Sequence, residues 1–160
     1  MSETPLPHLS ETGDARMVDV SAKAVTARTA TAAGRVRLSA PAVAALRSGS
    51  LPKGDALAVA RIAGIQAAKK TPDLIPLCHP LAISAVDVVL EVTDDGVEIV
   101  ATVKTTDRTG VEMEALTAVS VAGLAVVDMV KAVDRAAVIS DVRVLAKSGG
   151  RRGDWTRDGE

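Results

Sequence analysis

The chain has 160 residues and a formal net charge of −1 at pH 7, so it is long enough for one domain with a sizeable core and lacks a basic coat for nucleic acid. Its single tryptophan, with no phenylalanine or tyrosine, excludes aromatic platforms that stack on bases and implies an aliphatic core. One cysteine excludes an internal disulfide and a cysteine-ligated iron–sulfur cluster, and it suits a reducing cytoplasm.

The two ends of the chain differ in composition from its middle. Residues 1–14 are polar, contain two prolines and show no periodicity, so we expect a flexible arm there. The arm lacks the basic and then apolar pattern of a secretion signal, which favours a cytoplasmic location. Residues 149–160 are polar and rich in glycine, and we expect a flexible tail. Between them, residues 15–148 are expected to form a single domain without internal repeats.

The first half of this domain shows strand patterns and then helix signals. Residues 17–20 are compatible with a short strand, and residues 24–38 alternate small apolar with polar side chains, which predicts a longer one. A short helix is predicted over residues 39–47. A second helix begins after Asp55, a good N-cap, and ends at the Thr71–Pro72 pair. Its predicted apolar face consists of Leu57, Val59, Ile62, Ala63 and Ile65.

The second half contains a predicted hairpin, a long helix and a last strand. Residues 82–93 and 97–107 alternate apolar and polar side chains on either side of an Asp–Gly turn. Residues 137–146 show a further strand pattern. The resulting order of elements is βαββαβ, which predicts an α+β, ferredoxin-like core: an antiparallel sheet with helices packed on one face.

The long helix, predicted over residues 110–131, is the most apolar stretch of the chain. Glu112 and Glu114 stand at its N-terminus and Lys131 in its last turn, where the helix dipole favours these charges. Residues 115–127 carry no charge, so we expect the helix to be buried nearly all round. We take the run to be too short to span a bilayer, so no membrane partner is expected.

The two charged ends of this helix share a side but lie far apart. Glu114 and Asp128 fall within about 40° of each other around the axis, yet about 21 Å apart along it. One small substrate cannot touch both within one chain. A second subunit, packed antiparallel across a two-fold axis, would bring the front of one helix towards the back of the other.

A proline-bounded segment, residues 75–80, holds the adjacent Cys78 and His79. Adjacent residues rarely share a tetrahedral metal ion, so we predict no metal site. A histidine held in a rigid loop suits an acid, a base or a ligand donor, and the alternative is a histidine that is merely hydrogen-bonded. Cys78 is interpreted as a packed residue, since nothing nearby lowers its pKa.

Several cations are candidates for binding phosphate. Lys53 precedes a helix N-terminus, although a solvated lysine is the common alternative. The alternative for Lys69 is that it complements the C-terminal end of a helix, and the alternative for Lys147 is that it solubilises the polar tail. Asp128 and Lys131 form a charged pair on an otherwise apolar helix, either for proton transfer or as a salt bridge. Together these groups favour a phosphate-bearing substrate and non-redox chemistry.

Six ungapped segments form an ordered set of motifs: ARMVDVS at 15–21, KGD at 53–55, ARIAGIQAAK at 60–69, DLIPLCHPL at 73–81, TGVEMEALTA at 109–118 and DMVK at 128–131. Together they resemble the MoaC family of cyclic pyranopterin monophosphate synthases. Several long motifs in the same order are far more specific than one short pattern. The resemblance runs from about His8 to Arg152.

The resemblance implies a reaction in molybdenum cofactor biosynthesis. A radical cyclase makes 3′,8-cyclo-7,8-dihydro-GTP, and the MoaC-like enzyme, a phosphorus–oxygen lyase, converts it to cyclic pyranopterin monophosphate and releases diphosphate. No protein-bound cofactor is then required, although Mg²⁺ bound to the triphosphate is compatible with this reaction. The resemblance also implies a homohexamer, a trimer of dimers, with active sites at subunit interfaces.

The same resemblance implies the site residues within the catalytic domain. Asp128 would be the general acid and base, with Lys131 as its partner and Lys53 as a second catalytic lysine. The residues expected to bind substrate are Leu77, Cys78, His79, Lys69, Glu112, Met113, Glu114 and Lys147. The alternative is a non-catalytic ferredoxin-like module that binds a phosphorylated effector, which would release no diphosphate.

Overall fold

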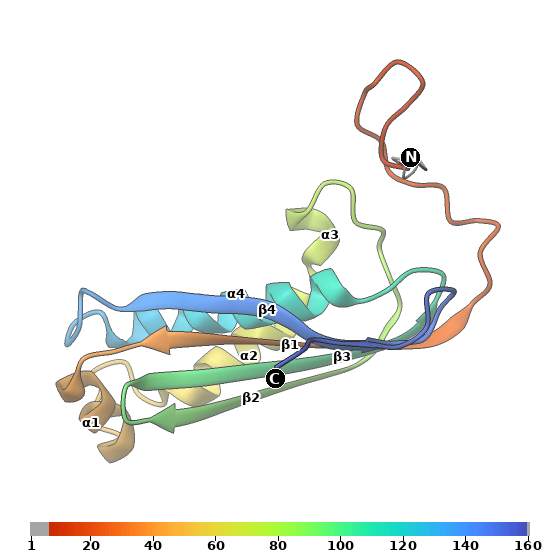
Figure 1. The fold of residues 1–160 in the computed structure, drawn as a ribbon. Coiled ribbons are helices and arrows are strands. Elements are labelled where there is room, and N and C mark those ends of the chain that lie inside the picture. The colour runs from red at the N-terminus through yellow and green to blue at the C-terminus, as the bar shows by residue number, and fades with distance from the viewer. Residues whose placement is uncertain (1–6, 160) are drawn as a thin grey trace.

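The polypeptide path is that of a computed structural model, which describes residues 7–159. Residues 1–6 of the expected arm and Glu160 of the expected tail lie outside the described residues. The elements in chain order are β1 (Thr26–Arg37), α1 (Ala40–Ser48), α2 (Ala56–Lys69), α3 (Thr71–Leu74), β2 (Ile83–Thr93), β3 (Gly96–Asp107), α4 (Glu112–Val130), β4 (Val138–Ser148) and β5 (Trp155–Thr156). Residues 7–25 extend away from the body formed by these elements (Figure 1).

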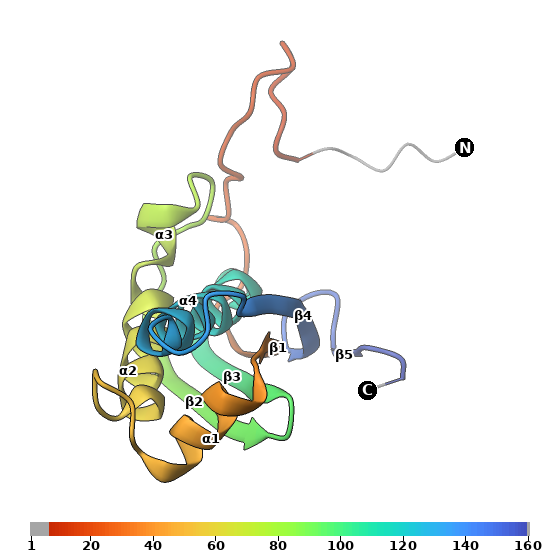
Figure 2. The ribbon, with the colours of Figure 1, turned by 90° about the vertical axis from the view of Figure 1, so that its left-hand side faces the viewer.

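One antiparallel sheet with the strand order β2-β3-β1-β4-β5 forms the frame of the molecule. The central strand β1 pairs with β3 on one side and β4 on the other. Helices α2 and α4 lie side by side on the same face of this sheet (Figure 2). The predicted α+β, ferredoxin-like core is therefore confirmed.

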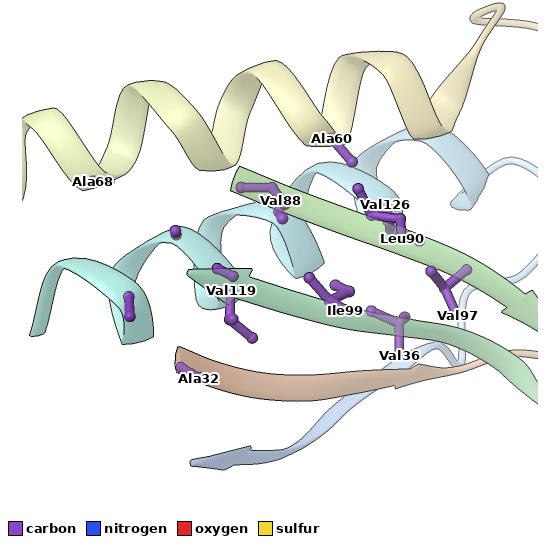
Figure 3. Packing of buried hydrophobic residues seen from close by; sticks show 14 of the residues in the cluster. Ala32, Val36, Ala60, Ala68, Val88, Leu90, Val97, Ile99, Val119 and Val126 are labelled. Atoms are coloured by element: carbon purple, nitrogen blue, oxygen red, sulfur yellow. The ribbon is translucent and has the colours of Figure 1, made fainter. Parts of the chain in front are cut away.

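The hairpin of β2 and β3 follows the predicted alternation. Val88 and Leu90 on β2, and Val97, Ile99, Ala101 and Val103 on β3, are buried beneath the helices. Val119 and Val126 of α4 pack in the same cluster as Val36 and Ile99 of the sheet (Figure 3). The core is built from aliphatic side chains, as the composition predicts.

The predicted apolar face of α2 is wrong in part: Leu57 and Ile65 pack against the core, but Val59 and Ile62 do not. The helix buries Ala56, Ala60, Gly64, Ala67 and Ala68, whereas Val59 and Ile62 are 47% and 56% exposed. A Cβ atom on Gly64 would lie 2.9 Å from the carbonyl oxygen of Ala118 on α4. The two helices approach so closely that only small side chains fit between them, and Val59 and Ile62 point outward.

Helix α4 is not buried nearly all round, which corrects a second expectation. Its inner side packs on α2 and the sheet, but Met113 and Leu124 on its outer side are exposed, the latter by 57%. By length and composition α4 is also long enough to cross a membrane, so length alone does not exclude a span. Half of its most apolar window is buried inside the fold, as in the core helix of a globular domain.

Three short segments also differ from expectation. Residues 17–20 form no strand but run outside the sheet. Helix α2 ends at Lys69, just before Thr71 and Pro72 as predicted, but these two residues then begin the single turn α3. Within the segment expected to be a tail, Trp155 and Thr156 pair with Lys147 and Ala146 as the short strand β5.

Candidate active site

Helix α4 connects two groups of predicted site residues, one at each end. Glu112 and Glu114 stand in its first turn, Asp128 in its last turn, and Lys131 is its C-cap. Because α4 is a continuous helix, Glu114 and Asp128 are separated by about 21 Å along its axis. Each end receives side chains from a different part of the chain.

At the C-terminal end, Asp128 lies between two lysines. Lys131 Nζ donates to Asp128 Oδ1 at 2.7 Å, and Lys53 Nζ donates to Asp128 Oδ2 at 2.7 Å. Both carboxylate oxygens therefore have an ammonium partner, and about half of each side chain remains exposed to solvent. Three charged groups in contact give this end a formal charge of +1.

These contacts shift the proton affinities of the cluster. The hydrogen bond from Lys131, followed by the one from Lys53, lowers the pKa of Asp128 to about 2. The hydrogen bond to Asp128 in turn raises the pKa of Lys131. The free site thus holds an ionised carboxylate and an ammonium group, the arrangement needed to bind an anion and then exchange a proton.

The start of α2 places Lys53 in this cluster. Gly54 has a φ of +92°, which favours glycine, and lets the loop turn back into the helix. Asp55 then caps α2, and its side chain accepts from the Ala58 N–H at 3.0 Å. Because α2 packs antiparallel to α4, its first turn lies beside the last turn of α4.

At the N-terminal end of α4, the environment is more enclosed. Glu114 is 3% exposed, and this burial raises the pKa of its carboxyl group. Burial, followed by the nearby Glu114, raises the pKa of the Cys78 thiol. Lys147 on β4 donates to Glu112 Oε1 at 2.8 Å. Met113 and Leu77 are the exposed apolar side chains of this group.

The remaining predicted residues also lie at this end. His79 is half-buried, and its Nε2 lies 2.6 Å from the carbonyl oxygen of Val18. Lys69 is in the last turn of α2, which the antiparallel packing places beside the first turn of α4. The structure therefore brings the eleven predicted residues into two groups and leaves those groups apart within one chain.

Some residues that shape the site escaped the sequence reasoning. Arg28 on β1 donates to the carbonyl oxygens of Asp107 and Arg108 at 3.0 and 3.1 Å, and so holds the loop that leads into α4. Val18 contributes only a main-chain oxygen, for which a sequence carries no signal. Arg28 alternates with the buried Ala30, Ala32 and Val36 on β1, so an arginine on the core-facing side of the strand is the one clue available.

No metal cluster was predicted, and within residues 7–159 no three His, Cys, Asp or Glu side chains are grouped to hold a metal ion. The charged groups at both ends of α4 are instead lysine–carboxylate pairs. Such pairs offer cations to phosphate oxygens and a carboxylate for proton transfer.

Comparison with known proteins gives consistent matches over nearly the whole chain. The model of the MoaC family matches residues 17–150. A cyclic pyranopterin monophosphate synthase of Nocardioides sp. is 69% identical over 162 residues, covering 98% of this chain and 99% of the relative. One of Streptomyces avermitilis is 70% identical and covers 95% of this chain and 89% of the relative. Cyclic pyranopterin monophosphate synthase 2 of Mycobacterium tuberculosis is 64% identical, covering 95% and 91%.

Proposed function

The chain belongs to the MoaC family, and on that premise we propose that it is a cyclic pyranopterin monophosphate synthase of molybdenum cofactor biosynthesis. Its substrate is 3′,8-cyclo-7,8-dihydro-GTP, supplied by a radical cyclase. Its products are cyclic pyranopterin monophosphate and diphosphate, which makes it a phosphorus–oxygen lyase. The relatives named above support this reaction by their identity over nearly the full chain.

The position of Asp128 between Lys53 and Lys131 is the observation that carries the mechanism. A carboxylate whose pKa is about 2 is a poor base at neutral pH, because it holds a proton too weakly. When substrate phosphates arrive, they compete for the lysine ammonium groups. Lys53 then turns to the phosphate, the pKa of Asp128 rises, and Asp128 becomes an effective base beside Lys131.

Formation of the cyclic phosphate is the step that these groups serve most directly. A hydroxyl oxygen of the sugar-derived part attacks the α-phosphorus, and its proton passes to Asp128. The bond from the α-phosphorus to the bridging oxygen of the β-phosphate breaks, and diphosphate leaves with the bonding pair. Lys53 and Lys131 stabilise the negative charge that grows on the leaving group.

The group at the N-terminal end of α4 binds the rest of the substrate in this proposal. Leu77 and Met113 offer apolar contact, and Cys78, His79 and Glu114 offer polar contacts in a partly enclosed setting. Lys69 and Lys147 are placed to meet phosphate oxygens, with Glu112 holding Lys147. Buried Glu114, with its raised pKa, is suited to hydrogen-bond the heterocycle.

A complete site then requires two subunits. The two groups are about 21 Å apart along α4, too far for one substrate to touch both in a single chain. Leu124 on α4 and Val59 and Ile62 on α2 are exposed apolar side chains, which support a subunit contact through these two helices. We propose a homohexamer, a trimer of dimers, in which each site takes one end of α4 from each partner.

The rearrangement moves protons and phosphate but transfers no electrons to the protein. No protein-bound cofactor is therefore proposed, and any Mg²⁺ would enter with the triphosphate, whose oxygens are its preferred ligands. The proposed location is the cytoplasm. No nucleic acid or membrane is proposed as a partner.

Incubation with 3′,8-cyclo-7,8-dihydro-GTP tests the proposal. Equal amounts of cyclic pyranopterin monophosphate and diphosphate are expected from the wild-type protein. Asp128→Asn keeps the size and one of the two acceptor atoms but cannot move a proton, so it should bind the substrate and release almost no diphosphate. Binding by the wild type without diphosphate release would instead favour a non-catalytic module that binds a phosphorylated effector.

A further inference from the structure

His79 has a hydrogen bond that determines where its ring carries a proton. Its Nε2 atom lies 2.6 Å from the main-chain carbonyl oxygen of Val18, 61 positions earlier in the chain. A carbonyl oxygen has no proton to give, so Nε2 must be the donor. The neutral ring in this contact therefore carries its single proton on Nε2.

We infer that residues 17–21 are a positioning element for His79: their carbonyl at Val18 fixes the Nε2–H tautomer, so that Nδ1 is the atom presented to the substrate. The part of this inference that concerns substrate rests on the proposed function. The tautomer itself does not, because it follows from a contact within the free chain.

The tautomer decides what kind of ligand atom His79 recognises. Among residues 7–159, Nδ1 has no hydrogen-bond partner. In the neutral Nε2–H ring, Nδ1 carries a lone pair, so it accepts a hydrogen bond from an N–H or O–H group of the purine-derived substrate. If that group gives up its proton, Nδ1 takes it, and the Nε2–H bond to Val18 stays in place. In the opposite tautomer Nδ1 would carry a hydrogen, and it could not accept a hydrogen bond from the N–H or O–H group of the substrate.

A local turn holds the carbonyl of Val18 in position. Asp19 Oδ1 accepts from the Ser21 N–H at 2.9 Å, immediately after Val18. Hydrogen bonds from Ser21 are the main cause of the lowered pKa of Asp19, and the attraction to His79 contributes least to that lowering. Asp19 therefore acts on His79 by shaping the turn rather than by its charge.

Nitrogen NMR of the full-length protein reads the tautomer directly. The chain has two histidines, so in a His8→Gln variant labelled with ¹⁵N-histidine every imidazole signal belongs to His79. Spectra are recorded without substrate at a pH where the same signals show a neutral ring. We expect the chemical shift of a protonated nitrogen at Nε2 and of an unprotonated nitrogen at Nδ1. A protonated Nδ1 in the neutral ring would overturn the inference.

Two substitutions at Asp19 test the role of the turn. Asp19→Asn keeps an oxygen that accepts from Ser21, so the wild-type nitrogen shifts should remain. Asp19→Ala removes that acceptor, and the two nitrogen shifts should move towards each other as both tautomers become populated. With the proposed substrate, Asp19→Ala should also lower kcat/KM about tenfold, and Asp19→Asn should not.

These outcomes separate the inference from the proposed function. If Asp19→Ala keeps the wild-type nitrogen shifts, residues 17–21 do not position the ring, whatever the activity. If the Nε2–H tautomer is found but the wild type turns over no substrate, the proposed function fails while the positioning of His79 stands.

Discussion

Lys53 Nζ lies 2.7 Å from Asp128 Oδ2, although the two residues are 75 positions apart in the chain. The contact exists because α2 packs antiparallel to α4, which brings the loop before one helix to the end of the other. Lys53 is therefore held beside the proposed acid and base rather than free in solvent. This placement gives the lysine a role that can be tested apart from folding.

Replacing Lys53 by alanine should reduce turnover by about 100-fold or more, because the substrate loses a cation that stabilises developing phosphate charge. The free energy of unfolding should change by no more than about 0.5 kcal/mol, since an exposed loop lysine packs little. Diphosphate release and urea denaturation measure the two effects. Lys104→Ala is the matched control, because Lys104 is an exposed lysine on the opposite face of the sheet. A large loss of stability with normal activity per folded molecule would contradict the catalytic role.

The lowered pKa of Asp128 predicts a pH-dependent contribution to stability. Its folded-state pKa is about 2 and the ordinary pKa of an aspartate is 3.8, so the ionised carboxylate stabilises the fold above the higher value. That contribution is lost as the pH falls through about 2. The difference in Tm between wild type and Asp128→Asn should therefore be positive at neutral pH and shrink below about pH 4. Asp87→Asn, at an exposed position on β2 away from the lysine pair, is the matched control.

Local patterns carried enough information to predict an antiparallel sheet and the order of the main strands and helices along the chain. The alternation of Val97, Ile99, Ala101 and Val103 places one face of β3 on the core, and a turn with Asp95 and Gly96 defines the hairpin. Local patterns could not predict which side chains of α2 face away from the core. Hydropathy ranks Val59 and Ile62 above the alanines, but the separation of the helices is a property of both α2 and α4 and selects the smaller side chains.

The candidate site shows a similar division. The separation of Glu114 and Asp128 along one helix follows from spacing and the set of site residues from the resemblance, whereas their partners follow from neither. Lys53 meets Asp128, and Lys147 meets Glu112, through packing between segments far apart in the chain. The carbonyl of Val18 is a main-chain atom that any residue could supply, so no sequence pattern points to it.

The close approach of α2 and α4 predicts an unusual effect of alanine at Gly64. In an exposed helix, glycine to alanine stabilises by about 1 kcal/mol. Here the new Cβ would lie 2.9 Å from the carbonyl oxygen of Ala118 and 3.3 Å from the Cβ of Ala122. Overpacking costs about 1–3 kcal/mol, so we expect a net loss of about 1 kcal/mol in the free energy of unfolding, measured by urea denaturation. Gln66→Ala on the exposed side of α2 should change it by less than about 0.5 kcal/mol, and a stabilised Gly64→Ala protein would show that the helices are further apart.

Sharing of the active site predicts that two inactive variants restore each other. Glu114→Ala disables the N-terminal end of α4, and Asp128→Ala disables the C-terminal end. If each site takes one end from each partner, a mixed dimer has one site with both defects and one with neither. Equal amounts mixed at random give about half mixed dimers, so diphosphate release should recover to about a quarter of the wild-type value, with independent sites.

A second mixture makes this test specific. Lys53 and Asp128 belong to the same end of α4, as their hydrogen bond shows. In a dimer of Lys53→Ala and Asp128→Ala chains, both sites therefore keep one defect, and no activity should return. Mass spectrometry of isotopically labelled chains checks that subunits exchange in both mixtures. Recovery in the first mixture alone supports a shared site, whereas equal recovery in both would come from an effect other than sharing. If exchange is complete and neither mixture recovers, the substrate is held within one subunit by residues other than these.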